Sequence, residues 1–404
     1  MENIFITYQE ALSILASHAT EFPEESRRLE DCVGAYLAED LKADRDFPPF
    51  DRVTMDGIAI AYDSFYEGRR MYAIQETAPA GTPQKTLKDF RDCIEVMTGA
   101  IMPEGADTVI RYEDLEIEEG RAGILADTLK PRQNVHFKGM DIPGDQIIVS
   151  RGTRLSSAEI NIAAAVGKAS LRVKALPRTV IISTGDELVE VAQSPEPHQI
   201  RRSNIYGIQS TLKQWGVEAA LQHLPDDKEA MEKIISKLLQ QYDLLVFTGG
   251  VSKGKFDYLP EVLESLGIEK HFHKIQQRPG KPFWFGSNQD GKRIFALPGN
   301  PVSSFVCVYM YLRYWLDACL GIDQPALYVE LKKDVHFTPD LVYFLEARLE
   351  SRKDGKLIAD PVKGNGSGDF ANLVRTDGFL VLPQNKSAFR KGEVYPFVSY
   401  RTNF

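Results

Sequence analysis

A loop in the second half of the chain, PGNPVSS, combines residue types that begin a helix with residue types that hold an anion. Asn300 can cap a helix, Pro301 suits its first position, and Ser303 adds a hydroxyl beside free backbone N–H groups. Such a helix start attracts negative charge. A plain tight turn is the alternative if the loop is taken alone.

Two further loops strengthen the case for an anion site. In TGGVSKG, Gly249 and Gly250 allow a ligand to approach the backbone closely, and Ser252 supplies a donor. In RPGKP, Arg278 and Lys281 bracket a Pro-Gly turn, so that two cations lie next to one strand end. Although a solvated surface pair is the alternative for these cations, the three loops together favour a phosphate or tetrahedral-oxyanion pocket.

Carboxylates accompany this basic set. Glu187, Asp226 and Asp257 lie in or near the same loops, and Asp56 lies in a TMDG turn. Acids beside an anion pocket often hold a hard cation such as Mg²⁺, which bridges phosphates. Each acid alone is more often a turn or cap residue, and Asp226 with Asp227 could simply start the next helix.

A regular alternation of strands and helices positions these loops. The strands TVIIST, EAALQH, DLLVFT, HFHKIQ and RIFALP follow Pro177. The expected helices run around Asn204 to Trp215, Asp227 to Gln240, Tyr258 to Leu266, and Pro301 to about Cys319. Such alternation predicts a parallel sheet covered by helices on both faces, with ligands bound beyond the carboxyl ends of its strands.

The remaining chain predicts further domains. Thr7 and Glu10 form a capping box before an amphipathic helix, and a second helical run is capped by Ser156 or Ser157 and ended by Gly167. Gly- and Pro-punctuated β runs lie between them and after the α/β region. We predict residues 1–46 and 146–176 as a discontinuous helical domain, 47–145 as an inserted β domain, 177–323 as the α/β domain and 324–404 as a β domain.

Composition narrows the possible functions. The chain has 404 residues, enough for several domains, and its net charge of -9 argues against a protein that wraps nucleic acid. It shows no secretory signal pattern and no long apolar stretch, so we expect a cytoplasmic protein without a membrane span. The four cysteines form no CxxC pair, and no neighbouring ligand completes a zinc set with His271 and His273.

In this order the loops resemble the molybdopterin molybdenumtransferase family, which comprises the MoeA proteins and the E domain of gephyrin. The matching strings are PPFDRVTMDGIAI, VMTGAIMPEGADTVIRYED, GMDIPGD, STGDEL, TGGVSKGKFDY, RPGKPFWFG and LPGNPVSS. The resemblance implies a multidomain α/β and β fold: a discontinuous helical domain with an inserted β domain, a three-layer molybdopterin-binding α/β domain and a C-terminal β-barrel-like domain.

The resemblance also implies an activity. Members of this family use molybdate and adenylylated molybdopterin, with Mg²⁺, to form molybdenum cofactor and release AMP. It further implies a homodimer that works with molybdopterin adenylyltransferase and with molybdoenzyme apoproteins. A non-catalytic dimeric scaffold of the gephyrin type and a molybdopterin adenylyltransferase are the alternatives.

The family's site residues carry over onto matching positions. The active-site acids and threonine fall on Asp56, Thr98, Asp141, Glu187, Asp226 and Asp257, of which Glu187, Asp226 and Asp257 are the expected metal ligands. The substrate-binding positions fall on Gly249, Gly250, Ser252, Lys274, Arg278, Lys281, Asn300 and Ser303, with Arg348 and Ser367 from the C-terminal domain. The chain departs from the family at Arg278, where many relatives have Lys, and at Lys255, where an acid is usual.

Overall fold

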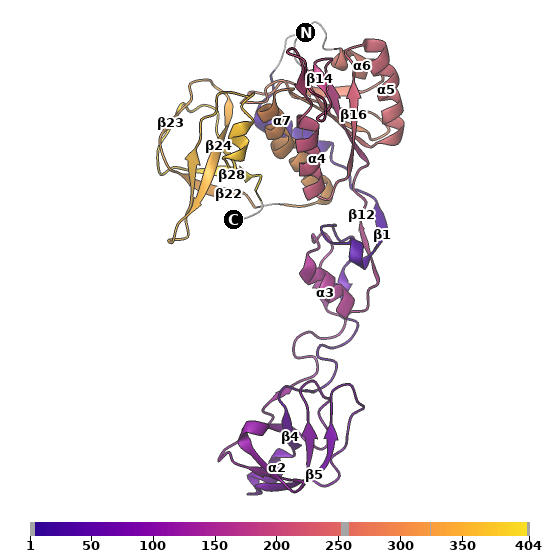
Figure 1. The fold of residues 1–404 in the computed structure, drawn as a ribbon, viewed down its shortest axis with the longest axis vertical. Helices are drawn as coiled ribbons and strands as arrows, with labels where there is room; N and C mark the ends of the chain where they lie inside the picture. Colours follow the sequence, from indigo (N-terminus) through magenta and orange to yellow (C-terminus); the bar gives the residue numbers. More distant parts are fainter. Residues whose placement is uncertain (1–4, 252–257, 324, 402–404) are drawn as a thin grey trace. The chain divides into compact units, whose positions relative to one another are not determined.

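The computed structural model describes residues 5–251, 258–323 and 325–401, and it divides the chain into two compact units (Figure 1). The first unit contains Met1–Glu25, Gly34–Tyr36 and Val173–Phe404, and the second contains Ser26–Val33 and Leu37–Arg172. None of the helices in these described ranges is both long enough and apolar enough to cross a bilayer.

A six-stranded sheet is the centre of the first unit. Its order is β16 (Ala219–Leu224), β13 (Thr179–Thr184), β17 (Leu244–Thr248), β21 (Arg293–Leu297), β20 (Trp284–Ser287) and β18 (Glu269–His273). The first four strands are parallel, and β20 is antiparallel to both its neighbours. Consequently β18 runs in the same direction as the parallel strands. Five of these strands match the strands predicted from the sequence, and β20 was not predicted.

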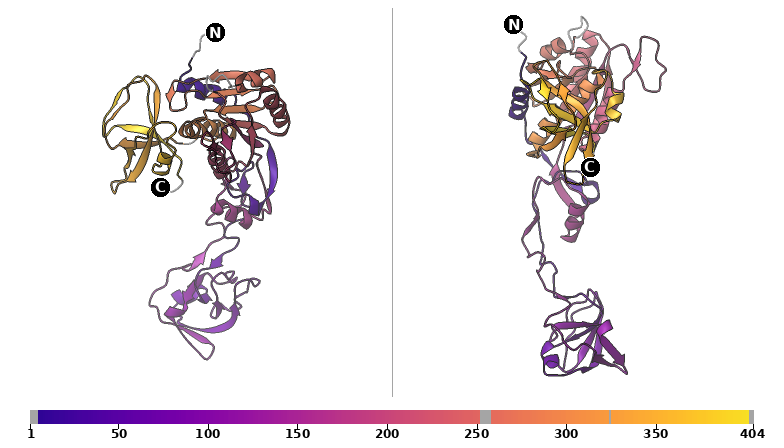
Figure 2. Two further views of the ribbon diagram at one scale, coloured as in Figure 1. Left: turned by 45° about the horizontal axis from the view of Figure 1, so that its top comes forward. Right: turned by 90° about the vertical axis from the view of Figure 1, so that its left-hand side faces the viewer.

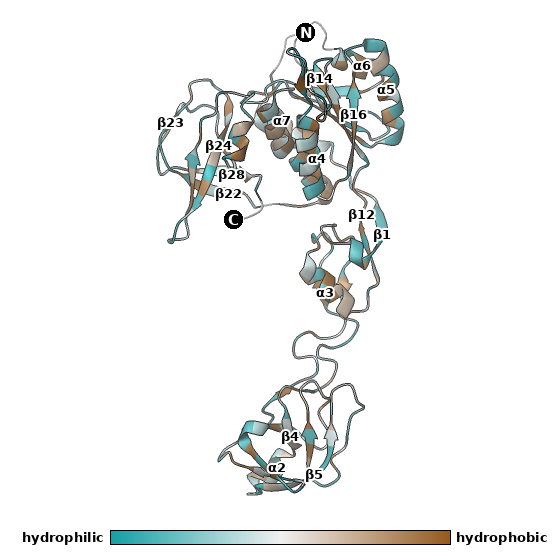
Figure 3. Cartoon of the chain, in the orientation of Figure 1, coloured by the Kyte–Doolittle hydropathy of each residue, from teal (hydrophilic) through white to brown (hydrophobic). Residues whose placement is uncertain are grey.

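Helices cover both faces of this sheet. They are α4 (Asn204–Gln214), α5 (Lys228–Gln241), α6 (Leu259–Ser265), α7 (Pro301–Cys307) and α8 (Arg313–Leu320), with the π-helical segment η3 (Val308–Leu312) joining the last two. Because side chains alternate along a strand, Ile181 packs with α4, α7 and α8, whereas Val180 and Ile182 pack with α5 and α6. Figure 3 shows hydrophilic and hydrophobic residues alternating along α5, as expected for a helix over a sheet.

The amino-terminal helix packs within the first unit. Helix α1 (Tyr8–Ser17) begins with the predicted Thr7–Glu10 capping box. Its buried residues Ala11 and Leu15 belong to the core of the first unit, where α1 contacts α8. The apolar stripe of α1 is therefore covered by the α/β region, whereas the second capped helix, α3 (Ser157–Ala165), belongs to the second unit. The two capped helices thus belong to different compact units, and the predicted domain ranges stay predictions.

The C-terminal region of the first unit is a closed β-barrel. Its strands follow the order β24 (Val342–Ser351), β25 (Leu357–Pro361), β22 (Leu327–Leu331), β28 (Val394–Ser399) and β26 (Gly378–Leu382), and β26 pairs with β24 to close the ring (Figure 2, yellow and orange). A two-residue strand from the α/β region, β19 (Gln277–Arg278), pairs with β24. Smaller elements of the first unit are β14 (Leu188–Val189), β15 (Ile200–Arg201), β23 (Val335–His336), β27 (Ala388–Phe389) and α9 (Ala371–Val374).

The second unit is built on another six-stranded sheet. Its order is β7 (Thr108–Arg111), β4 (Gly57–Ile60), β6 (Cys93–Val96), β5 (Met71–Ala78), β9 (Arg121–Ile124) and β8 (Leu115–Glu118). Short pairs join β3 (Arg52–Val53) to β10 (Val135–His136) and β2 (Leu41–Lys42) to β11 (Ile147–Val149), and α2 (Tyr62–Tyr66) follows β4. Strands β1 (Glu24–Arg28) and β12 (Ser170–Lys174) lie only in part in this unit, which also contains the short 3-10 helices η1 (Leu29–Asp31) and η2 (Tyr112–Asp114).

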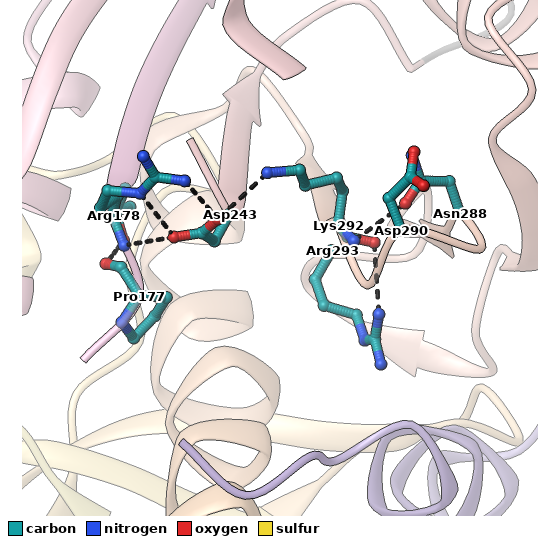
Figure 4. Close-up of polar contacts among 8 residues, drawn as sticks. Pro177, Arg178, Asp243, Asn288, Asp290, Lys292 and Arg293 are labelled. Atoms are coloured by element: carbon teal, nitrogen blue, oxygen red, sulfur yellow. Dashed lines mark hydrogen bonds and ion pairs between the residues drawn. The ribbon is translucent and has the colours of Figure 1, made fainter. Parts of the chain in front are cut away.

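An ion-pair cluster holds the amino ends of the parallel strands in the first unit (Figure 4). Arg178, just before β13, donates two hydrogen bonds of 2.9 Å to the carboxylate of Asp243, just before β17. Lys292, just before β21, donates to the same carboxylate at 3.1 Å. These cations hold the pKa of Asp243 well below its usual range, chiefly through the Arg178 hydrogen bonds. Three neighbouring strands are thus tied together at the edge opposite the loops that follow them.

Candidate active site

A cavity of about 460 Å³ opens at the carboxyl ends of the parallel strands. Strand β16 follows β13 along the chain and lies on one side of it, whereas β17 lies on the other side. Ligands of open α/β sheets bind where the strand order reverses in this way, because the loops diverge there. The cavity is lined by the ends of β13 and β17 and by the loop after β21, so the predicted loops converge on it.

Two of the predicted acids line this first cavity. Glu187 lies in the turn after β13, where a Cβ added to Gly185 would lie only 2.5 Å from the Glu187 carboxylate. Asp227 is the residue that caps α5, since its carboxylate accepts from the Ala230 N–H at 2.7 Å. Asp226 is therefore not the cap: it lines the cavity, and its own N–H donates to Asp186.

The glycine loop after β17 packs tightly on the end of β13. Gly249 and Gly250 have φ values of +102° and +73°, and a Cβ on Gly249 would lie 2.8 Å from the Thr184 hydroxyl. Only glycine fits this approach without strain. Both glycines line the first cavity. Ser252, Lys255 and Asp257, from the same loop, lie outside the described residues.

Sequence reasoning missed polar residues at the start of α4. The Asn204 amide donates to the Thr248 hydroxyl at 3.0 Å and to the Gly299 carbonyl at 2.7 Å, so it joins the loops after β17 and β21. Arg201 and Arg202 also line the first cavity, and Arg202 forms an ion pair with Glu190. The RRSN string could have predicted this position, because it places two cations and a capping residue type at a helix start, and PGNP likewise places a capping residue type at one.

A second cavity of about 610 Å³ adjoins the first and shares Pro282, Pro298 and Asn300 with it. Its lining includes five predicted substrate-binding residues, namely Arg278, Lys281, Asn300, Ser303 and Ser367. It also includes Lys363, which the sequence analysis did not single out. Arg278, Lys281 and Lys363 form no ion pair with any residue in the described ranges, although the Lys281 ammonium lies 4.3 Å from the centre of the Phe5 ring. Their charge is thus available to an anion.

The start of α7 joins the α/β sheet to the barrel region at this cavity. Asn300 occupies the predicted cap position, yet its side chain makes no capping hydrogen bond. It donates instead to the Ser367 hydroxyl at 2.9 Å, and the Val302 N–H donates to the Ser367 carbonyl at 3.1 Å. The loop KGNGSGD is therefore fixed on the helix start, which brings Ser367 and Ser303 to one cavity.

Three charged residues of the first unit differ in their relation to the second cavity. Glu346, which the sequence analysis missed, lines it and is only 8% exposed, and burial raises the pKa of its carboxyl group. Lys274 is buried, with a φ of +82°, and Arg348 is exposed on β24. Neither Lys274 nor Arg348 is among the described residues that line the two cavities.

The second unit contains the remaining predicted site residues. The Asp56 carboxylate accepts from the Thr98 N–H at 2.6 Å and from the Thr98 hydroxyl at 2.8 Å. These two bonds lower the pKa of Asp56, so the structure brings this predicted pair together. The Asp141 carboxylate is hydrogen-bonded to His136 Nε2 at 2.8 Å, and His136 Nδ1 lies 3.2 Å from the Arg52 guanidinium. Because Arg52 can only donate, His136 carries its proton on Nε2 and donates it to Asp141.

The first unit therefore defines a class of protein: a three-layer α/β enzyme fold with a polar site at its carboxyl edge and a closed β-barrel beside that site. Family comparisons are consistent along the chain. Residues 6–167 match the MoeA N-terminal region (domain I and II), 180–318 match a probable molybdopterin binding domain, and 328–399 match the MoeA C-terminal region (domain IV). The chain belongs to the molybdopterin molybdenumtransferase family of enzymes, the MoeA proteins of molybdenum cofactor biosynthesis.

Individual relatives span the whole chain. It is 42% identical over 398 residues to the molybdopterin molybdenumtransferase of Synechocystis sp., covering 98% of this chain and 100% of the relative. It is 30% identical over 376 residues to that of Bacillus subtilis, covering 90% and 87%. The crystal structure of the MoeA protein of Pyrococcus horikoshii matches with a TM-score of 0.84 at 28% identity, covering 99% and 100%. The predicted family, enzyme class and fold class are confirmed.

Proposed function

We propose that this chain transfers molybdenum from molybdate to adenylylated molybdopterin, releasing AMP and forming molybdenum cofactor. The observation that supports this best is the pair of adjoining cavities, one lined by Glu187 and Asp226 and the other by three cations that have no ion-pair partner in the described ranges. A phosphorylated substrate and a tetrahedral oxyanion can occupy two such cavities side by side.

The second cavity is suited to the oxyanion. Arg278 can hold two oxygens through its planar fork, and Lys281 and Lys363 add compact charges. The hydroxyl groups of Ser303 and Ser367 complete a polar lining. Fixed positive charge in such a site stabilises negative charge that develops during the reaction, and the loss of one donor typically costs about 100-fold or more in rate.

The acids of the first cavity fit a magnesium ion. Mg²⁺ is usually held by one or two carboxylates together with phosphate oxygens of the substrate. Glu187 and Asp226 line one cavity and offer such oxygens, and the third expected ligand, Asp257, lies outside the described residues. When bound, Mg²⁺ would neutralise phosphate charge. Gly249 and Gly250 let the backbone approach the phosphate, while Asn204 keeps the loops after β17 and β21 together.

We further propose a homodimer in which Asp56, Thr98 and Asp141 serve the active site of the partner subunit. The partners expected from the family are molybdopterin adenylyltransferase and molybdoenzyme apoproteins, and we expect the reaction to take place in the cytoplasm.

Reconstitution tests the proposed reaction. The purified chain, given adenylylated molybdopterin, Mg²⁺ and molybdate, should restore activity to a cofactor-free molybdoenzyme and release AMP. Adenylylation of molybdopterin on incubation with ATP would support an adenylyltransferase instead. Absence of binding to both molybdate and adenylylated molybdopterin in calorimetry would support a scaffold.

A further inference from the structure

A buried polar network lies beneath the turn that carries Arg278 and Lys281. The Gln277 side chain is 1% exposed, and its amide N–H donates to the Pro279 carbonyl at 2.9 Å. Its amide oxygen accepts a hydrogen bond from the hydroxyl of Tyr311, which is fully buried. Buried polar groups are costly unless they are bonded, so this pairing specifies a single arrangement of the turn.

The other side of the turn is equally constrained. The Cys307 thiol lies 3.9 Å from the Gln277 amide nitrogen and 3.8 Å from the Gly280 carbonyl oxygen. A Cβ added to Gly280 would lie 2.6 Å from the Gln277 amide nitrogen and 2.8 Å from the Cys307 sulfur. The backbone between the two cations therefore rests directly on Gln277 and Cys307. A displacement of Gln277 would move this backbone and both cations with it.

The helix that supplies Tyr311 also supplies the serine of the second cavity. Ser303 lies in α7, and Tyr311 lies in the π-helical segment η3 that continues it. Successive residues of an α-helix are rotated by about 100°, and the wider π turn accommodates an extra residue, which changes the direction of the side chains around it. Segment η3 thus directs the Tyr311 hydroxyl to Gln277. One helix and one hydrogen-bond network fix the two cations relative to the Ser303 hydroxyl.

We propose that Gln277 and Tyr311 are positioning residues of the oxyanion site. This inference rests on the proposed function of the second cavity. The Tyr311 hydroxyl acts on the turn through Gln277, and the Gln277 amide holds the Pro279 carbonyl and hence the spacing of Arg278 and Lys281. A displacement of about 1 Å at a positioned charge can cost about 100-fold in rate. Loss of the network is therefore expected to weaken the anion site by more than the energy of its two hydrogen bonds.

Three variants separate positioning from folding. Gln277→Met keeps the length of the side chain, Tyr311→Phe removes only a hydroxyl, and the double variant removes both partners of their shared bond. Each single variant leaves a buried polar group unbonded and should lower the Tm, and the double variant should be more stable than either. We expect the KM for molybdate to rise about tenfold in all three, with weaker binding of tungstate in calorimetry and a smaller change in kcat. If the double variant regains both stability and the wild-type KM, the network serves folding alone and the proposal is overturned.

Two controls complete the test. Tyr309→Phe removes a hydroxyl from the same π-helical segment, but that hydroxyl is hydrogen-bonded to Thr211 and not to the turn between Arg278 and Lys281. The KM for molybdate should therefore stay near the wild-type value. Lys281→Ala tests the cavity itself. If it binds tungstate as the wild type does, the second cavity is not the oxyanion site and the proposed function fails. If Lys281→Ala binds weakly while the double variant binds normally, only the positioning role is overturned.

Discussion

Lys363 extends the cationic set of the second cavity from the two residues of the RPGKP turn to three. It comes from a different part of the chain, the KGNGSGD loop, which the Asn300–Ser367 contact fixes on the start of α7. An anion held between Arg278 and Lys363 therefore contacts both the α/β region and the barrel region. Specificity for a doubly charged oxyanion is expected to depend on all three charges.

Removal of this third charge is a direct test at the residue scale. Lys363→Ala should raise the KM for molybdate about tenfold or more in the reconstitution assay, because it removes a cation that has no counter-ion in the described ranges. Lys353→Ala, in the exposed turn between β24 and β25, removes an equal charge away from both cavities and should leave the KM unchanged. Equal KM values for the two variants would contradict a role for Lys363.

The neighbours Asp226 and Asp227 offer a matched pair. Asp226→Ala should lower turnover by about 100-fold while the protein stays folded, because Asp226 lines the first cavity. Asp227→Ala should lower the free energy of unfolding by about 1 kcal/mol, since it removes the cap of α5, and should leave turnover close to that of the wild type. Denaturant unfolding and initial rates on both proteins check the assignment, and exchanged phenotypes would refute it.

The ion-pair cluster around Asp243 makes a prediction at the scale of elements. Its folded-state pKa lies below the unfolded value of about 3.9, so its contribution is present at neutral pH and is lost as the pH falls below about 4. The carboxylate is 39% exposed, and solvent screening limits its contribution to about 1 kcal/mol. Asp243→Asn should therefore lower the Tm at pH 7, and the difference from the wild type should shrink below pH 4.

Melting curves followed by circular dichroism between pH 3 and pH 7 would measure this difference. Asp290→Asn is a suitable control, since Asp290 lies in the turn before β21 and accepts a hydrogen bond from Asn288, not from a cation (Figure 4). It should leave the Tm at pH 7 near the wild-type value. A difference between Asp243→Asn and the wild type that stays constant down to pH 3 would show that the ion pairs do not stabilise the sheet.

Local patterns were sufficient to predict most elements of the α/β region. Capping residues and periodic apolar positions are local signals, so the starts of α1, α5 and α7 could be read from Thr7, Asp227 and Pro301. Strands β20 and β19 were not predicted, because a strand forms only when it pairs with another strand, and local sequence does not reveal that partner. Strand β20 pairs with β21, and β19 pairs with β24. The π-helical segment was missed because no local residue type distinguishes it from the α-helix that it interrupts.

The site could be predicted only in part, for the same reason. Loops after parallel strands converge by geometry, so Glu187, Gly249 and Gly250 could be placed together. Glu346 and Lys363 could not be placed in the second cavity from the sequence. Closure of the barrel brings β24 and the KGNGSGD loop to that cavity, and this closure depends on contacts between distant parts of the chain. The role of Asn300 was similarly misread, since its partner Ser367 lies far along the chain.

At the scale of the whole molecule, the proposed homodimer predicts complementation between inactive variants. Asp56→Ala and Glu187→Ala should each be inactive alone, because each removes one acid from every site. After subunit exchange in a mixture, about a quarter of the wild-type activity should return, since half of the dimers are mixed and each of these keeps one intact site. Light scattering checks that dimers form. Dimers that exchange subunits without any return of activity would show that Asp56 and Glu187 act from the same subunit.

The pairing of β19 with β24 has a consequence for the order of events during synthesis. Strand β19 carries Arg278, whereas its partner β24 begins at Val342 and is closed into the barrel by β26. When only the α/β region of a nascent chain has left the ribosome, β24 is still missing, so Gln277 and Arg278 have no strand to pair with. We therefore expect the proposed oxyanion site to form only after the strands of the barrel have left the ribosome.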